Sequence, residues 1–180
     1  MNIAVFCSAA ELPDVYKDAA REFGSLLGSK GHTLVWGGSD KGLMKVIADA
    51  VQESGGTLRG VSVEYLKHHA RESADEMYIA KDLGERKATM LLWADAIVML
   101  VGGIGSLDEV TDVLEQKKHG AHDKRIIVLN INGFYEGLRV QLTRMESEGF
   151  LQSGAMPRPL SELVHFSDTP EDAMRYIESD

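Results

Sequence analysis

Cysteine is almost absent from the sequence, since Cys7 is the only one among 180 residues. A single cysteine excludes any disulfide within the chain, so a reducing compartment such as the cytoplasm is expected. Proline is scarce as well: three of the four prolines, Pro157, Pro159 and Pro170, lie near the C-terminus. No proline-rich linker, low-complexity segment or internal repeat divides the sequence, and we therefore expect one domain that spans residues 1–180.

Long apolar runs and an excess of positive charge are also lacking. The apolar run in "MNIAVFCSAA" is too short for a secretory signal or a membrane span and lacks basic residues, so neither is expected there. Lysine and arginine number 19 against 28 aspartates and glutamates, which gives a net charge of −9. A general nucleic-acid surface needs cations to neutralise phosphates, so neither a nucleic acid nor a membrane is expected as a partner. This charge still allows a local basic pocket for one small anion.

Short apolar segments rich in β-branched residues alternate with longer segments of helical period. Strands that alternate with helices of this length predict parallel pairing through right-handed crossovers. The sequence thus predicts an α/β fold in three layers, with a mostly parallel central sheet of about seven strands and helices on both faces. The expected strands are 2–7, 33–37, 57–63, 76–81, 95–101, 125–131 and 163–167, and the expected helices are 11–29, 42–54, 83–93, 106–118, 134–149 and 170–178. Residues 64–75 are predicted as a loop or short helix beside the end of the third strand.

Three of the expected strands end in unusual residues: Cys7-Ser8-Ala9-Ala10, the stretch 37–44, and Gly102-Gly103-Ile104-Gly105-Ser106. In a parallel sheet, ligands bind outside the carboxyl ends of the strands. Glycine permits close approach of a ligand to the backbone, and a helix start offers free N–H groups to an anion. Neither glycine turn is a Walker A motif, and Asp108 stands where a dinucleotide fingerprint has its third glycine. The two turns together favour a mononucleotide or sugar phosphate and weigh against a dinucleotide-dependent oxidoreductase.

The acids that follow the second glycine turn allow two interpretations. Ser106 and Glu109 fit the S-x-x-E capping box of a helix that begins at residue 106. Alternatively, one of the acids faces a ribose, whose glycosidic carbon develops positive charge when the bond to a base breaks.

Arg86 and Lys87 lie near the start of an expected helix, where cations are unfavourable. Such local conflicts concentrate at functional sites, and arginine provides paired donors for a phosphate. The alternative is that both side chains are exposed and pair with Asp82 or Glu85.

With these residues in view, the chain resembles the LONELY GUY family, characterised as cytokinin riboside 5′-monophosphate phosphoribohydrolases. The family's P-G-G-x-G-T-x-x-E turn corresponds to Val101–Glu109, and its R-K pair corresponds to Arg86 and Lys87. The resemblance covers nearly the whole chain in order. Further matches are residues 5–8, residues 37–44, Gly120 and residues 122–124.

The resemblance implies a Rossmann-like homodimer that hydrolyses a nucleoside 5′-monophosphate, AMP or a cytokinin riboside monophosphate, to free base and ribose 5-phosphate. It implies no metal and no organic cofactor. Arg86 and Glu109 would be the catalytic pair. Lys87, Gly102, Gly103, Gly105 and Ser106 would hold the phosphate and ribose, while Ser8, Gly37 and Gly38 would complete the pocket wall.

Several positions depart from the family pattern. Val101 replaces the proline, Ser106 replaces the threonine, and residues 39–45 and 115–118 differ from the usual stretches. Because the family's helix around 115–118 helps to form the pocket for the base, a plain purine is expected in preference to a prenylated adenine. Molybdenum-cofactor carrier proteins resemble the same family, so a non-catalytic carrier of a nucleotide or of that cofactor is the alternative. The presence of both Arg86 and Glu109 favours the enzyme.

Overall fold

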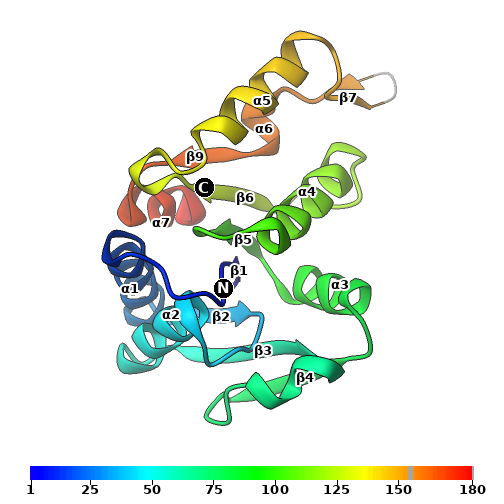
Figure 1. The fold of residues 1–180 in the computed structure, drawn as a ribbon. Helices are drawn as coiled ribbons and strands as arrows, with labels where there is room; N and C mark the ends of the chain where they lie inside the picture. Colours follow the sequence, from blue (N-terminus) through cyan, green and yellow to red (C-terminus); the bar gives the residue numbers. More distant parts are fainter. Residues whose placement is uncertain (154–155, 180) are drawn as a thin grey trace.

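The computed structural model describes residues 1–153 and 156–179 and contains a seven-stranded sheet whose strands all run parallel (Figure 1). The strand order is β4-β3-β2-β1-β5-β6-β9. These strands are β1 (Asn2–Phe6), β2 (Thr33–Trp36), β3 (Thr57–Val63), β4 (Glu76–Ala80), β5 (Ala96–Met99), β6 (Arg125–Leu129) and β9 (His165–Ser167). The helices are α1 (Asp14–Ser29), α2 (Gly42–Glu53), η1 (Glu64–His69), α3 (Leu83–Trp93), α4 (Ile104–Lys118), η2 (Ile131–Gly133), α5 (Glu136–Ser147), α6 (Leu160–Leu163) and α7 (Pro170–Glu178). A short antiparallel ribbon joins β7 (Gln152–Ser153) to β8 (Met156–Pro157).

Helices cover both faces of this sheet. Figure 1 shows α1, α2 and α7 on one side and α3, α4 and α5 on the other. Successive residues of β1 point to opposite cores: Ile3 and Val5 pack with α1, α2 and α7, whereas Ala4 and Phe6 pack with the helices of the other layer. Burial on both faces explains why β5 is wholly apolar. The predicted three-layer α/β fold is confirmed.

The strand order reverses beside β1. From β1 the chain builds β2, β3 and β4 on one side, then returns to place β5, β6 and β9 on the other. Such a reversal leaves a crevice at the carboxyl ends of the two strands that flank it. The segment that follows β1 and the glycine turn that follows β5 meet there, and the Ser8 N–H donates to the Val101 carbonyl at 3.2 Å.

Helix α4 begins earlier than the capping box predicts. It starts at Ile104 with Gly103 as N-cap and has no side-chain cap. Ser106 is therefore the third helical residue and Glu109 lies in the second turn, so the capping-box interpretation is wrong. Reciprocal caps of this kind occur at α3 instead, where the Asp82 side chain accepts from the Glu85 N–H at 2.8 Å and the Glu85 carboxylate accepts from the Lys81 N–H at 2.7 Å.

The glycine turn after β5 is held by Tyr135, which is 3% exposed. The Gly102 N–H donates to the Tyr135 hydroxyl at 2.9 Å, and this hydroxyl donates to the Leu100 carbonyl at 2.9 Å. A Cβ at Gly102 would lie 2.1 Å from Ser106 Oγ, so close packing alone requires glycine there. Burial raises the pKa of the Tyr135 hydroxyl, which keeps its proton for donation.

Tyr135→Phe is expected to lower the free energy of unfolding by about 2 kcal/mol, because it leaves a buried N–H and a buried carbonyl without their partner. Urea denaturation followed by circular dichroism measures this loss. Tyr65→Phe is the matched control, since Tyr65 is exposed, and it should change the stability little. Equal effects of the two substitutions would contradict a role for the Tyr135 hydroxyl.

Candidate active site

The carboxyl ends of β1, β2, β3 and β5 open into one cavity of about 390 Å³. Two of the ten predicted site residues, Gly38 and Gly102, do not line it. The eight that do are Ser8, Gly37, Arg86, Lys87, Gly103, Gly105, Ser106 and Glu109. The cavity thus gathers residues from four separate segments of the chain.

Arg86 and Glu109 form a buried ion pair in this cavity. Arg86 lies on the first turns of α3, and its guanidinium donates one hydrogen bond to the Val61 carbonyl at 2.9 Å and another to the Glu109 carboxylate. The two side chains are only 11% and 7% exposed. Removing one member of such a pair leaves an uncompensated buried charge, so each requires the other.

The absence of a side chain at Gly37 leaves room for the Arg86 guanidinium. A Cβ at Gly37 would come within 2.1 Å of an Arg86 guanidinium nitrogen and 2.9 Å of the Met44 methyl carbon. Glycine is therefore required at position 37 for a steric reason that is independent of any ligand, because the Arg86 side chain lies directly against the backbone there.

The environment of Glu109 changes its acidity. Burial raises the pKa of its carboxyl above the ordinary value, while the Arg86 charge and hydrogen bond oppose this rise and Asp108 adds to it. Glu109 therefore takes up a proton at a higher pH than an exposed glutamate does, and it depends on Arg86 for its charge. Such a carboxylate is suited to accept a proton in mild conditions.

The second turn combines open backbone with a helix start. No atom lies within 4 Å of a Cβ built at Gly103 or at Gly105, and both residues line the cavity. The fifteen-residue helix α4 directs its positive end there, where an anion is favoured. Two acids follow closely, but each has a cation from α3: Glu109 pairs with Arg86, and Asp108 pairs with Lys87 at 3.1 Å.

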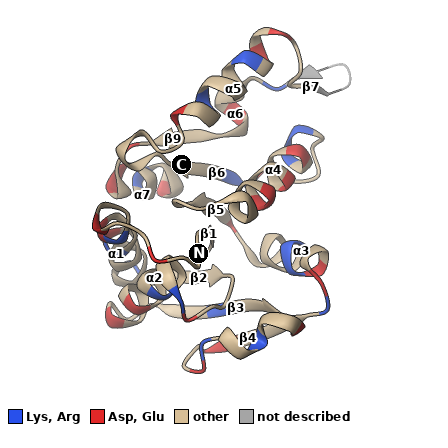
Figure 2. Ribbon diagram, in the orientation of Figure 1, with Lys and Arg blue, Asp and Glu red and all other residues tan. Residues whose placement is uncertain are grey.

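The alternative pairing of Arg86 and Lys87 with acids of their own helix is wrong. Their ionic partners all lie on α4, and Lys87 also approaches Asp112 at 3.6 Å. Figure 2 shows basic residues on α3 and several acidic residues on α4, which lies on the same side of the sheet. The unfavourable cations near the start of α3 are thus explained by contacts between the two helices.

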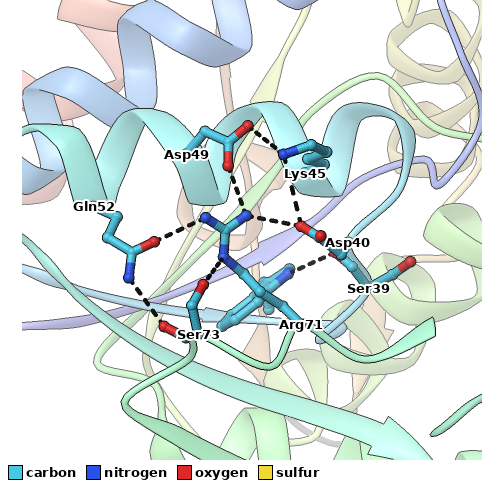
Figure 3. A network of polar contacts seen from close by, with 8 residues as sticks. Ser39, Asp40, Lys45, Asp49, Gln52, Arg71 and Ser73 are labelled. Carbon is cyan, nitrogen blue, oxygen red and sulfur yellow. Dashed lines mark hydrogen bonds and ion pairs between the residues drawn. The ribbon is translucent and has the colours of Figure 1, made fainter. Parts of the chain in front are cut away.

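Arg71, which no sequence pattern marked as a site residue, connects the two segments that border the cavity after β2 and β3. Arg71 is 9% exposed, and its guanidinium donates to Asp40 at 2.9 Å, Asp49 at 2.7 Å and Gln52 at 2.8 Å (Figure 3). Its backbone N–H donates to the Gly38 carbonyl at 2.8 Å, which gives Gly38 a structural place beside the cavity. The network ties the segment after β3 to the loop after β2 and to α2.

Eleven further residues line the cavity that were not among the predicted site residues. They are Cys7, Ala9, Ser39, Lys41, Met44, Ser62, Val63, Leu66, His69, Leu83 and Asp108. Residues 64–69 form the short helix η1, and Ser39 pairs with Ala70 as an isolated antiparallel bridge. By contrast, residues 115–118 do not line the cavity, and the buried Lys117 ammonium donates to the Lys124 carbonyl at 2.8 Å. Of the two stretches that depart from the family pattern, residues 39–45 therefore border the cavity of this chain, whereas residues 115–118 do not.

Burial raises the pKa of the Cys7 thiol, which keeps it in the unreactive protonated form. Among the residues that the structure describes, no group of three or more histidine, cysteine or acidic side chains is placed to hold a metal ion.

The fold and the cavity define a class of protein: a Rossmann-like α/β protein whose glycine turn and helix start line a cavity beside a buried arginine–glutamate pair. Within this class, the chain belongs to the family described as "possible lysine decarboxylase", whose model matches residues 44–177. Together with the curated relatives below, which include LOG3 of Arabidopsis thaliana, this match confirms the resemblance to the LONELY GUY family.

Curated relatives carry a more specific name, cytokinin riboside 5′-monophosphate phosphoribohydrolase. The protein from Mycobacterium marinum is 36% identical over 159 residues, which are 87% of this chain and 85% of the relative. The Mycobacterium tuberculosis protein is 33% identical and covers 97% of this chain and 91% of its own length. LOG3 from Arabidopsis thaliana is 31% identical, with coverages of 98% and 81%.

Solved structures share the fold at lower identity. The molybdenum cofactor carrier protein of Chlamydomonas reinhardtii has a TM-score of 0.74 and 20% identity, and the match covers 98% of this chain and 94% of that one. The molybdenum cofactor binding protein of Rippkaea orientalis has a TM-score of 0.73 and 19% identity, with coverages of 98% and 93%. At this identity the likeness establishes the fold alone.

Gly37→Ala is expected to raise the pKa of Glu109 further, because the new methyl group displaces the Arg86 guanidinium that keeps the carboxylate charged. Carboxyl carbon chemical shifts followed by NMR across a pH series measure it. Gly103→Ala is the matched control, since a Cβ there meets nothing within 4 Å. An unchanged Glu109 titration in Gly37→Ala would disprove this steric coupling.

Proposed function

We propose that the protein is a phosphoribohydrolase, which cleaves the N-glycosidic bond of a nucleoside 5′-monophosphate and releases the free base and ribose 5-phosphate. The observation that carries the proposal is the buried Arg86–Glu109 pair, which lines the same cavity as the helix start at Gly103 and Gly105. The printed names of curated relatives at 31–36% identity support it.

The substrate phosphate binds at the start of α4. Backbone N–H groups of the glycine turn, the Ser106 hydroxyl and the positive helix end hold the phosphate oxygens. Lys87 adds positive charge at the same end of the cavity. The ribose then lies between this turn and Glu109, with its glycosidic carbon beside the carboxylate.

In the reaction, a water oxygen forms a bond to the anomeric carbon of the ribose while the bond from that carbon to the base nitrogen breaks. The electron pair of the broken bond stays on the base nitrogen, which takes up a proton from the solvent. The ionised Glu109 accepts a proton from the attacking water and stabilises the positive charge that develops on the sugar. Arg86 orients this carboxylate through its hydrogen bond and keeps it ionised.

Residues 1–180 act as one nucleotide-binding domain that forms a homodimer in the cytoplasm. Two large exposed apolar side chains support the dimer: Leu92 on α3 and Ile104 at the start of α4, which are 78% and 85% exposed. Exposed apolar groups of this size gather at interfaces. In the described part of the chain, no helix has both the length and the apolar character needed to cross a membrane.

The first test is chromatography of a panel of nucleoside monophosphates, AMP and a cytokinin riboside monophosphate included, after incubation with the protein. Free base and ribose 5-phosphate are the expected products. Glu109→Gln and Arg86→Ala should each lower kcat/KM by at least about 100-fold, because each removes a group that acts in the transition state.

Exposed pairs elsewhere provide the controls, and Arg139→Ala, which breaks a pair with Glu136, should retain full activity. Tight binding of a nucleotide or of the molybdenum cofactor with no turnover by the wild type would instead favour the carrier. Full activity in both site variants would rule out the assigned catalytic pair.

The activity should also depend on pH through Glu109. Because the reaction needs the ionised carboxylate, kcat/KM is lost as the pH falls through the raised pKa of Glu109, and the acid limb lies above the ordinary value of 4.5. Asp108→Asn removes a charge that raises this pKa and should move the limb to lower pH. Asp112→Asn is the control on the same helix, and an equal shift in both variants would contradict the assignment.

A further inference from the structure

The cavity extends well beyond the part assigned to phosphate and ribose. The glycine turn follows β5, whereas Lys41 follows β2 and η1 follows β3, and the sheet order between them is β3-β2-β1-β5. Neighbouring strands lie about 4.8 Å apart, so the ends of β3 and β5 are about 14 Å from each other. A nucleotide with its phosphate on α4 and its ribose beside Glu109 therefore directs its base toward Lys41, Leu66 and His69.

Two basic side chains meet at this end of the cavity. Lys41 Nζ lies 3.2 Å from His69 Nε2, and both residues line the cavity. In the part of the chain that the structure describes, neither forms an ion pair with a carboxylate. The nearest acid in sequence, Asp40, directs its carboxylate to Arg71 at 2.9 Å and to Lys45 at 3.9 Å. The Lys41 ammonium is therefore available to a ligand.

The arrangement is fixed by the backbone and by the neighbouring network. The Asp40 N–H donates to the His69 carbonyl at 2.9 Å, and the contacts of Arg71 in Figure 3 join the same two segments. Burial, His68 and Lys41 lower the pKa of His69, so its ring is neutral near pH 7 and accepts a hydrogen bond from Lys41. An ammonium has three N–H groups, and two of them remain for the ligand.

We propose that Lys41 is a specificity-determining residue, which selects nucleotides whose purine carries a hydrogen-bond acceptor at position 6, the 6-oxopurines, over those with an amino group there. The inference rests on the proposed function, because it uses the position of the base that this function implies. In a purine, the edge farthest from the glycosidic nitrogen carries the substituent at position 6. A carbonyl at this position accepts from Lys41, whereas an amino group presents a second donor and offers the ammonium no acceptor.

A prenylated adenine fits this end of the cavity less well. Its hydrocarbon chain would lie beside the ammonium and would remove it from water without offering an acceptor. Leu66 and Leu83 can contact the flat faces of a base, so the surroundings suit a planar ring with a polar far edge.

The test compares kcat/KM for inosine monophosphate and AMP in the wild type, in Lys41→Met and in Lys67→Met. The wild type should prefer inosine monophosphate by at least about tenfold, and Lys41→Met should reduce this preference to near one. Lys67 lies on η1, pairs with Glu64 and does not line the cavity, so Lys67→Met should keep the wild-type ratio. A wild type that prefers AMP, or an unchanged ratio in Lys41→Met, would overturn the inference.

The same comparison is made by calorimetry in the Glu109→Gln background, where the two dissociation constants are measured without turnover. If the wild type cleaves neither nucleotide, the proposed hydrolysis fails, and the ratio of dissociation constants still decides the role of Lys41. If AMP is cleaved but neither ratio responds to Lys41→Met, the hydrolase stands and the specificity assignment fails.

Discussion

The buried ion pair between Arg86 and Glu109 constrains the whole site. Two charges that are about nine-tenths buried are tolerated only when their geometry is good and their remaining hydrogen-bonding groups are satisfied. The Val61 carbonyl at the end of β3 and the bare backbone of Gly37 after β2 meet these demands. The pair therefore fixes α3 and α4 relative to two strands, and the cavity takes its shape from that arrangement.

This pairing also explains how carboxylates can lie beside a helix start that favours an anion. Unpaired, Asp108 and Glu109 would repel a phosphate at the start of α4. Each is instead matched by a cation from α3, through Lys87 and Arg86. Because the cations of α3 neutralise these acids, the glycine turn at the start of α4 still attracts an anion, and a carboxylate remains next to it.

The sequence predicted what depends on local pattern and missed what depends on distant contacts. Apolar periodicity located each strand of the large sheet, and the turns at residues 37–44 and 102–106 pointed to the edge where the cavity lies. The start of α4 was misplaced because Ser106 and Glu109 satisfy a local capping rule, while tertiary contacts turn Glu109 to Arg86, 23 residues away. No local signal marks Arg71, whose partners Asp40 and Asp49 precede it by 31 and 22 residues.

Departures from the family pattern gain a physical meaning from these distant contacts. Asp40 and Lys45 belong to the stretch 39–45 that departs from the family pattern, and both join the Arg71 network rather than the cavity itself. The network draws the loop after β2 against the segment after β3, and this places Lys41 opposite His69. Asp40 from this loop, Asp49 from α2 and Arg71 therefore fix the wall together, and Lys41 lies on that wall beside His69. The groups proposed to act at the ribose and those proposed to select the base are thus separated in the fold, since the first lie on α3 and α4 and the second on the loops after β2 and β3.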